Sequence, residues 1–217
     1  MSFRVALTFD AEHPDRPHRP GGAEAVLETL VAHGVRATFF LQGRWVESEP
    51  TLARRVVADG HLVGSHSHYH ARMGLLSPDG FRTDVATAEG AIRRYTSVDP
   101  RPWLRFPFGS AATDAGRIAL LASLGYRHVG WHVEPKEWQR RATVQRVADA
   151  IVKESRAHGD GAIVLLHTWP RPVPVALGIA IPALAVAGAT FVRLDELNLP
   201  PGLEPIAEPR PAAIAGA

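Results

Sequence analysis

The chain begins with a short apolar run, RVALTF at residues 4–9, which ends in the acidic segment Asp10-Ala11-Glu12-His13. A run of this length with β-branched and aromatic residues predicts a buried strand. A dinucleotide-binding domain has a glycine-rich loop after its first strand to hold phosphates. This strand instead ends in carboxylates, so a nucleotide-binding Rossmann domain is not expected.

Strand-like and helix-like segments alternate along the rest of the chain. We expect strands at 4–9, 36–41, 61–65, 104–106, 127–131, 162–166 and 190–193. We expect helices at 23–32, 51–58, 78–95, 114–124, 143–158 and 175–187. Alternation at roughly 25–30 residues predicts a parallel α/β sheet with right-handed crossovers. Seven strands favour a barrel-like (β/α) arrangement over an open six-stranded sheet.

The composition is that of an ordinary globular domain. Of 217 residues, 46% are hydrophobic and 21% are charged, which excludes a disordered or collagen-like chain. The net charge is only +2, and no run of Lys and Arg exceeds two residues, so we expect no nucleic-acid partner. The absence of cysteine excludes disulfides, thiolate metal ligands and a cysteine nucleophile.

The two ends of the sequence carry further expectations. The first residues run directly into a strand, without the basic and apolar regions of a signal peptide, and no stretch of 18 apolar residues occurs. We therefore expect a cytoplasmic protein without a membrane partner. Residues 199–217 hold five of the 18 prolines, which predicts a loosely ordered tail. The sequence leaves the oligomeric state unknown.

Titratable side chains follow several of the expected strands. The carboxyl ends of strands carry the functional residues in parallel α/β architectures. We expect such a rim to contain Asp10, Glu12, His66, His70, Arg105, His132, Glu134, Glu137, Trp138 and His167.

Two histidines suggest a metal site on this rim. His66 and His70 have the spacing that places two imidazoles on the same side of a helical turn, which suits one metal ion. The pair His66 and His68, or a histidine-rich surface loop without a ligand, are alternatives. In an extended chain Glu12 points to the same side as Asp10, so that one carboxylate could bind metal and the other act as a base.

Other rim residues also have structural alternatives. Asp10 could simply cap a turn, and His167 could be a hydrogen-bonded core residue. If Arg105 points inward it needs an anionic partner, because an unpaired buried guanidinium is costly. A carboxylate of the rim is the obvious candidate.

In chain order these residues form five motifs: Thr-Phe-Asp at 8–10, His-Ser-x-x-His at 66–70, Arg-x-Pro-x-Gly at 105–109, acidic-x-x-acidic-Trp at 134–138, and an apolar run that ends in His167. Together they resemble the NodB-homology polysaccharide deacetylases, carbohydrate esterase family four. The resemblance extends from residue 5 to about residue 197. It implies a distorted (β/α)7-8 barrel at residues 1–198, as a single domain.

The resemblance also implies roles for the motif residues. The family removes N-acetyl or O-acetyl groups with one divalent metal, which polarises the acetyl carbonyl and holds the attacking water. His66 and His70 are then metal ligands. Asp10 is the general base beside Arg105, and His167 is the general acid beside Glu137. The expected substrate contacts are Phe108 through its backbone N–H, Trp138 and Leu165. Apart from the resemblance, Trp169 just beyond His167 could be a platform for a sugar ring or a part of the core.

The first motif departs from the family pattern. The usual Thr-Phe-Asp-Asp-Gly has a metal-binding second Asp, and this chain has Ala11 there. Some relatives use Asp-x-Asp or Asp-x-Glu instead, so we assign the third ligand to Glu12. Water, His13 or the absence of a metal are the alternatives. Zn²⁺ is the expected ion, with Co²⁺, Ni²⁺ and Mn²⁺ as further candidates.

The sequence therefore predicts a metal-dependent deacetylase that acts on a small acetylated saccharide or a related amide. Because Ala11 removes the usual ligand, a metal-independent hydrolase of a cyclic ureide or imide is the first alternative. A non-catalytic binder on the same scaffold is the second. The presence of both Asp10 and His167 argues against it, because a binder needs neither proton carrier.

Overall fold

The computed structural model describes residues 2–14 and 21–199 of the chain. The strands are β1 (Phe3–Ala11), β2 (Thr38–Leu41), β3 (Leu62–Ser65), β4 (Trp103–Leu104), β5 (Arg127–His128), β6 (Ala162–His167) and β7 (Ala189–Phe191). The α-helices are α1 (Gly22–Ala32), α2 (Gly43–Ser48), α3 (Pro50–Ala58), α4 (Pro78–Thr96), α5 (Ala115–Ser123), α6 (Val144–His158) and α7 (Val173–Val186). Each predicted strand and helix is present. The sequence pattern does not predict α2, because six residues are too few to establish a helical period.

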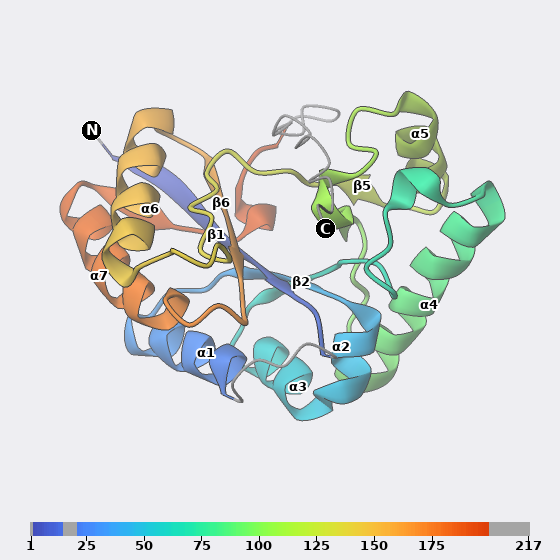
Figure 1. The fold of residues 1–217 in the computed structure, drawn as a ribbon, viewed down its shortest axis with the longest axis horizontal. Coiled ribbons are helices and arrows are strands. Elements are labelled where there is room, and N and C mark those ends of the chain that lie inside the picture. The colour runs from blue at the N-terminus through green and yellow to red at the C-terminus, as the bar shows by residue number, and fades with distance from the viewer. Residues whose placement is uncertain (1, 15–20, 200–217) are drawn as a thin grey trace.

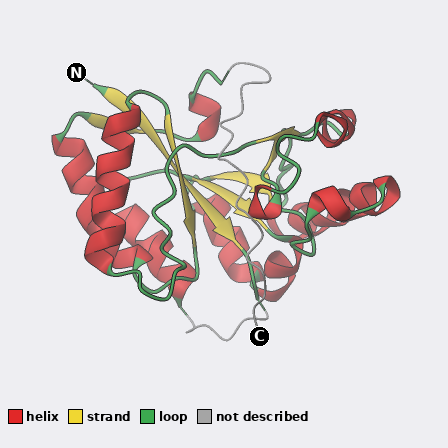
Figure 2. Cartoon of the chain, turned by 45° about the horizontal axis from the view of Figure 1, so that its top comes forward, coloured by secondary structure: helices red, strands yellow, loops and turns green. Residues whose placement is uncertain are grey.

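All the strand pairs are parallel, in the order β5-β4-β3-β2-β1-β6, and β7 pairs with the first residues of β1. The helices form an arc along the outside of the curled sheet (Figure 1), in which the strands lie side by side (Figure 2). After β5 the chain forms a single bridge, from Val133 to Val164 of β6. The result is a half-barrel, which confirms the predicted single-domain distorted (β/α) barrel. The predicted tail is residues 199–217, and the part after Leu199 lies outside the described residues.

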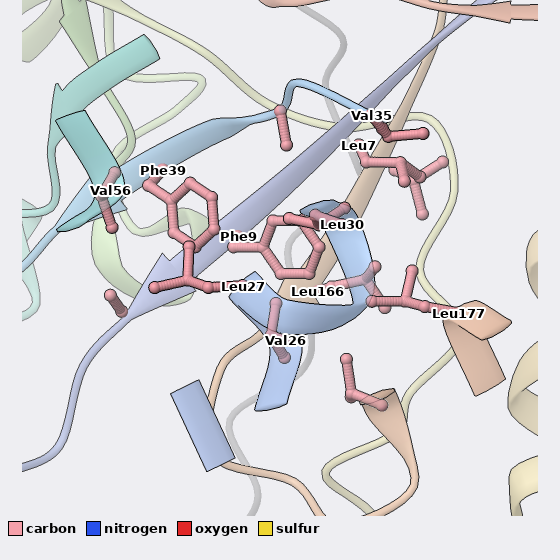
Figure 3. Close-up of a cluster of buried hydrophobic side chains, with 14 of the residues drawn as sticks. Leu7, Phe9, Val26, Leu27, Leu30, Val35, Phe39, Val56, Leu166 and Leu177 are labelled. Carbon is pink, nitrogen blue, oxygen red and sulfur yellow. The ribbon is translucent and has the colours of Figure 1, made fainter. Parts of the chain in front are cut away.

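β1 separates the hydrophobic core from the interior of the half-barrel. Val5, Leu7 and Phe9 pack outward against a core that α1 and α7 complete (Figure 3). Because successive strand side chains point to opposite faces, Thr8 and Asp10 point inward. Each fully buried Leu or Phe contributes about 1.5–3 kcal/mol, and a slip of one residue would exchange the two faces. The outward core residues therefore fix the place of Asp10 at the inner rim.

The helix boundaries follow their predicted signals. Ser77 caps α4, and its Oγ accepts a hydrogen bond from the Gly80 N–H at 3.0 Å. Gly34, Gly60, Gly125 and Gly159 follow the ends of helices with positive φ angles, a conformation that favours glycine.

The helix α7 is apolar along its whole length of 14 residues. It packs against α6 and α1 on the outer side of the sheet. Over residues 2–14 and 21–199, no helix has both the length and the apolar character that crossing a membrane requires.

Candidate metal centre and active site

The carboxyl ends of β1 and β6 bring Asp10 and His167 together. The two residues are direct partners in the register of these strands. Asp10 Oδ1 accepts a hydrogen bond from Nη1 of Arg105 at 2.9 Å, and both side chains are buried. The inference that Arg105 needs a rim carboxylate is therefore confirmed.

The guanidinium of Arg105 is fully enclosed and its donors have partners. Nη2 donates to Thr8 Oγ1 at 2.8 Å, and further bonds reach the carbonyl oxygens of Val129 and Gly130. The cation also lies over the ring of Phe40, 4.3 Å from its centroid. Burial lowers the pKa of Arg105, which the charge of Asp10 opposes. This network holds Asp10 in one orientation beside a fixed positive charge.

His167 has its own carboxylate partner, Glu137. Glu137 Oε1 accepts from both the backbone N–H of His167 (2.8 Å) and its Nδ1 (2.7 Å). Burial would lower the pKa of His167, but the charge and hydrogen bond of Glu137, with smaller contributions from Glu12 and Asp10, raise it to about 9. The imidazole is therefore protonated at neutral pH, the state that an acid needs. We call Asp10, Arg105, His167 and Glu137 the acid–base group.

Glu12, His66 and His70 form the other part of the site, which we call the ligand group. One ligand atom from each lies within 4.8 Å of the others. His66 Nε2 lies 3.2 Å from Glu12 Oε2, and His70 Nε2 also contacts Oε2. His66 Nδ1 lies 2.9 Å from the carbonyl oxygen of Arg105. A carbonyl only accepts, so Nδ1 carries a proton, and Nε2 is the His66 atom that could bind a metal when the imidazole is neutral.

This donor set fits a divalent metal. Two imidazole nitrogens and one carboxylate oxygen are the protein ligands of catalytic zinc sites that keep an open position. Burial would raise the pKa of Glu12, but hydrogen bonds from His13, His66 and His70 hold it well below its usual range. Burial would lower the pKa of His66, but Asp10 and Glu12 raise it. Burial lowers the pKa of His70. The carboxylate is thus ionised, as a ligand must be.

The two histidines do not converge by the predicted route. Residues 66–70 form an irregular loop and not a helical turn, and Ser67 and His70 have φ angles of 62° and 56°. The helical spacing was therefore the wrong reason to expect the two imidazoles close together. His68, the alternative partner of His66, is buried and is not part of the ligand group, and Gly43 at the start of α2 lies against it. A Cβ at position 43 would lie 2.2 Å from His68 Nδ1.

Two residues that the sequence analysis missed hold this loop. Asp84 is buried on α4, and its carboxylate accepts the backbone N–H groups of His68 (3.0 Å) and Tyr69 (3.1 Å). Gln42 accepts the N–H of His13 at 2.9 Å and donates to the carbonyl of His68 at 3.2 Å, so it joins the two ligand loops. Asp84 could have been found, because it interrupts the apolar face of a helix. Gln42 has no such signal.

The predicted substrate contacts surround the two groups in different ways. Phe108 has a φ of 58°, and its ring lies 4.5 Å from the His70 ring. Leu165 is buried on β6, and Trp138 is partly buried next to Glu137 in the chain. The indole nitrogen of Trp169 donates to Glu12 Oε1 at 3.2 Å. All four residues remain predicted substrate contacts.

His132 and Glu134 do not join the rim. They line a separate cavity of about 790 Å³ between the segment after β5 and α6, and no residue of the ligand or acid–base group lines it. The His132 ring stacks on His158, with centroids 3.8 Å apart. The expectation that the fifth strand delivers four rim residues is therefore wrong for these two.

Comparison with known proteins identifies related sequences. Residues 2–129 match the family model described as "Polysaccharide deacetylase". A chitooligosaccharide deacetylase from Bradyrhizobium is 37% identical over 208 residues, covering 89% of this chain and 90% of the relative. The peptidoglycan-N-acetylglucosamine deacetylase PgdA of Listeria monocytogenes is 32% identical, and the match covers 89% of this chain and 38% of that longer protein.

Solved structures have the same fold. A family 4 carbohydrate esterase from Streptomyces lividans in complex with acetate superposes with a TM-score of 0.75 at 27% identity, covering 86% of this chain and 90% of the other. A protein from Bacillus anthracis described as a CE4 family pseudoenzyme superposes with a TM-score of 0.79 at 27% identity, covering 90% and 65%. The fold thus occurs with and without activity. The family model, which matches more than half of the chain, and the Bradyrhizobium relative show that this chain belongs to the polysaccharide deacetylase family, the NodB-homology group of carbohydrate esterase family four.

Proposed function

We propose that this chain is a metal-dependent N-deacetylase of a short acetylated saccharide. The observation that carries the proposal is the meeting of the ligand group with both proton carriers. Asp10 Oδ2 lies 3.5 Å from His66 Nε2, and His167 Nε2 lies 3.8 Å from Glu12 Oε1. A base therefore lies beside a nitrogen of one ligand residue, and an acid lies beside the carboxylate of another. A pure binding protein has no use for this arrangement.

The acid–base group can move both protons that amide hydrolysis requires. Asp10, held by Arg105, accepts a proton from the attacking water. His167, held by Glu137, donates a proton to the leaving nitrogen. The backbone N–H of Phe108 is the proposed hydrogen-bond donor to the developing oxyanion.

In this proposal Glu12, His66 and His70 hold the metal. When bound, the metal supplies Lewis acidity toward the acetyl carbonyl and the attacking water. Zinc is the ion that we propose, because nitrogen and carboxylate ligands of this number suit it, and Co²⁺, Ni²⁺ and Mn²⁺ suit the same ligands. Glu12 thereby takes the place of the aspartate that Ala11 removes from the usual motif.

The substrate proposal rests on the relatives and on the side chains near the site. The Bradyrhizobium relative is named for chitooligosaccharides, and the match spans most of both chains. Phe108, Trp138, Leu165 and Trp169 are the proposed substrate contacts, with Trp138 and Leu165 at the acetyl group. A short saccharide or a related amide is therefore the first substrate class to test.

The test measures acetate release from N-acetylglucosamine oligomers by protein loaded with zinc, cobalt, nickel or manganese. We expect release that requires the metal and that Asp10→Asn reduces by about 10³-fold. Release by the wild-type protein no faster than by Asp10→Asn across N- and O-acetylated sugars would overturn the proposal. Turnover of a cyclic ureide or imide by metal-free protein would support the alternative hydrolase. A cytoplasmic location remains a prediction, which fractionation of cells that contain the native protein checks.

A further inference from the structure

The two oxygens of the Glu12 carboxylate face different neighbours. Oε2 faces the ligand histidines, with His66 Nε2 at 3.2 Å. Oε1 lies 3.2 Å from the indole nitrogen of Trp169 and 3.0 Å from Nε2 of His13, its two hydrogen-bond partners, and His167 Nε2 is farther away at 3.8 Å. Glu12 is only 3% exposed. Bulk water therefore has little access to replace either partner of Oε1.

Both partners of Oε1 are themselves held in place. Trp169 follows His167 by two residues, at the end of β6, and its ring lies 5.9 Å from the His167 ring. His13 has a φ of 59°, and its backbone N–H donates to Gln42. The His13 ring packs edge-on against His70, with centroids 4.4 Å apart. Each donor thus reaches Glu12 from a fixed backbone position.

The chemistry of the two donors limits what they do. An indole N–H only donates, so Trp169 cannot bind a metal. His13 does not belong to the group of three ligand residues, and its Nε2 approaches Oε1, whereas His66 approaches Oε2. A carboxylate with one oxygen occupied in this way has only the other oxygen to offer a metal.

We propose that Trp169 and His13 are positioning residues for the metal ligand Glu12. Their hydrogen bonds occupy Oε1, so that Glu12 binds through Oε2 alone, and the affinity for the divalent metal depends on both donors. The proposal rests on the proposed function only in requiring that a divalent metal binds to Glu12, His66 and His70. Trp169 then acts on the metal site whether or not its ring also touches a sugar.

Trp169→Phe removes the N–H and keeps an aromatic ring. Loss of such an outer hydrogen bond lowers metal affinity by about 10–100-fold. We expect that decrease for Zn²⁺, measured by competition with a chromophoric chelator, and a changed visible spectrum with Co²⁺. Trp103→Phe is the matched control, because Trp103 is a buried tryptophan that contacts Arg127 outside the site, and we expect it to leave both readouts unchanged. Thermal unfolding of the apoproteins identifies any loss of fold.

Two substitutions at His13 distinguish a hydrogen-bond donor from a metal ligand. His13→Gln keeps a side-chain N–H, whereas His13→Ala removes it. We expect His13→Ala to lower the affinity for Zn²⁺ by about 10-fold and His13→Gln to recover most of it. Loss of the metal in His13→Gln as complete as in His66→Ala would make His13 a ligand and overturn its positioning role.

The outcomes also separate this proposal from the proposed function. Unchanged Zn²⁺ affinity and Co²⁺ spectrum in Trp169→Phe would overturn the proposal, and a raised KM alone would assign Trp169 to the substrate. Wild-type protein that binds zinc but releases no acetate would overturn the proposed function and leave the affinity test valid. Wild-type protein that binds no divalent metal would overturn both.

Discussion

The acid–base group and the ligand group lie side by side but are held in different ways. In the acid–base group, each proton carrier bonds directly to the side chain of another member, as Asp10 does to Arg105. The strand register adds a second constraint, because Asp10 and His167 are partners across β1 and β6. In the ligand group, His66 and His70 belong to an irregular loop whose backbone is tied to Asp84 and Gln42.

The sheet thus holds the acid–base group in place, whereas a few side chains that bond to a loop hold the ligand group in place. Removing one partner of a strand-anchored ion pair lowers the free energy of unfolding, because the surrounding core keeps the other charge buried without its partner. Breaking a loop-anchored contact instead releases the loop and widens the range of ligand positions. Substitutions in the two groups should therefore affect different measurements.

The largest expected effect is on kcat, and it distinguishes residues that move protons from residues that bind the metal. Asp10→Asn should lower kcat by about 10³-fold with unchanged metal content, because it removes a proton acceptor and keeps the shape of the side chain. His66→Ala should remove both the activity and the stoichiometric metal. Acetate release and elemental analysis of the two variants provide the measurement. Loss of metal from Asp10→Asn would show that Asp10 is itself a ligand and that the two groups are one.

Arg105→Lys tests the strand-anchored side of the comparison. Lysine keeps the charge but cannot reproduce the planar set of donors that reaches Asp10, Thr8 and two carbonyl oxygens. We expect a loss of about 3 kcal/mol in the free energy of unfolding, since buried charge networks that lose partners cost about this much. Chemical denaturation measures it. Arg127→Lys, which changes an arginine that lies over the ring of Trp103, should cost far less.

Asp84→Asn tests the loop-anchored side. The carboxylate accepts two backbone N–H groups, and the amide that replaces it has only one oxygen to accept with. We expect a decrease in metal affinity of about 10-fold, with kcat at saturating metal close to wild type. Asp79→Asn, on the same helix but exposed, is the matched control. A decrease in kcat without weaker metal binding would contradict the division between the groups.

The smallest expected effect lies outside both groups, at His61. This buried histidine accepts the N–H of Ala37 through Nδ1 at 3.0 Å, and burial, with smaller effects of Arg193 and Arg55, lowers its pKa to about 4 despite the charge of Asp59. Between pH 6.5 and 4 the unfolded chain binds a proton that the folded chain does not, so stability falls as the pH falls through this range. We expect the free energy of unfolding at pH 6 to be about 0.8 kcal/mol lower than at pH 8 because of His61. His61→Asn should flatten the pH dependence of the unfolding free energy while metal affinity at neutral pH stays unchanged.

The sequence predicts the acid–base group better than the support of the ligand group, for a physical reason. The alternation of a strand and the rule that strand ends meet at one edge bring Asp10, Glu12 and His167 together. A buried arginine requires a carboxylate, which predicts a rim partner for Arg105, and the family resemblance implies that this partner is Asp10. No comparable rule exists for a side chain that bonds to the backbone of a distant loop. Gln42 was therefore missed, and the helical explanation for His66 and His70 failed.

The pairing of β1 with β6 has a consequence for the synthesis of the protein. Thr8 and Val164 are separated by 156 residues, yet they bond directly between these strands. Glu12, His66 and His70 all leave the ribosome within the first third of the chain, whereas His167 emerges about a hundred residues later. Until then one long edge of β1 has no β6 beside it, and an uncovered apolar strand edge is a site of aggregation. A nascent or shortened chain would thus contain all three ligand residues without its proton donor, and it would need protection until β6 arrives.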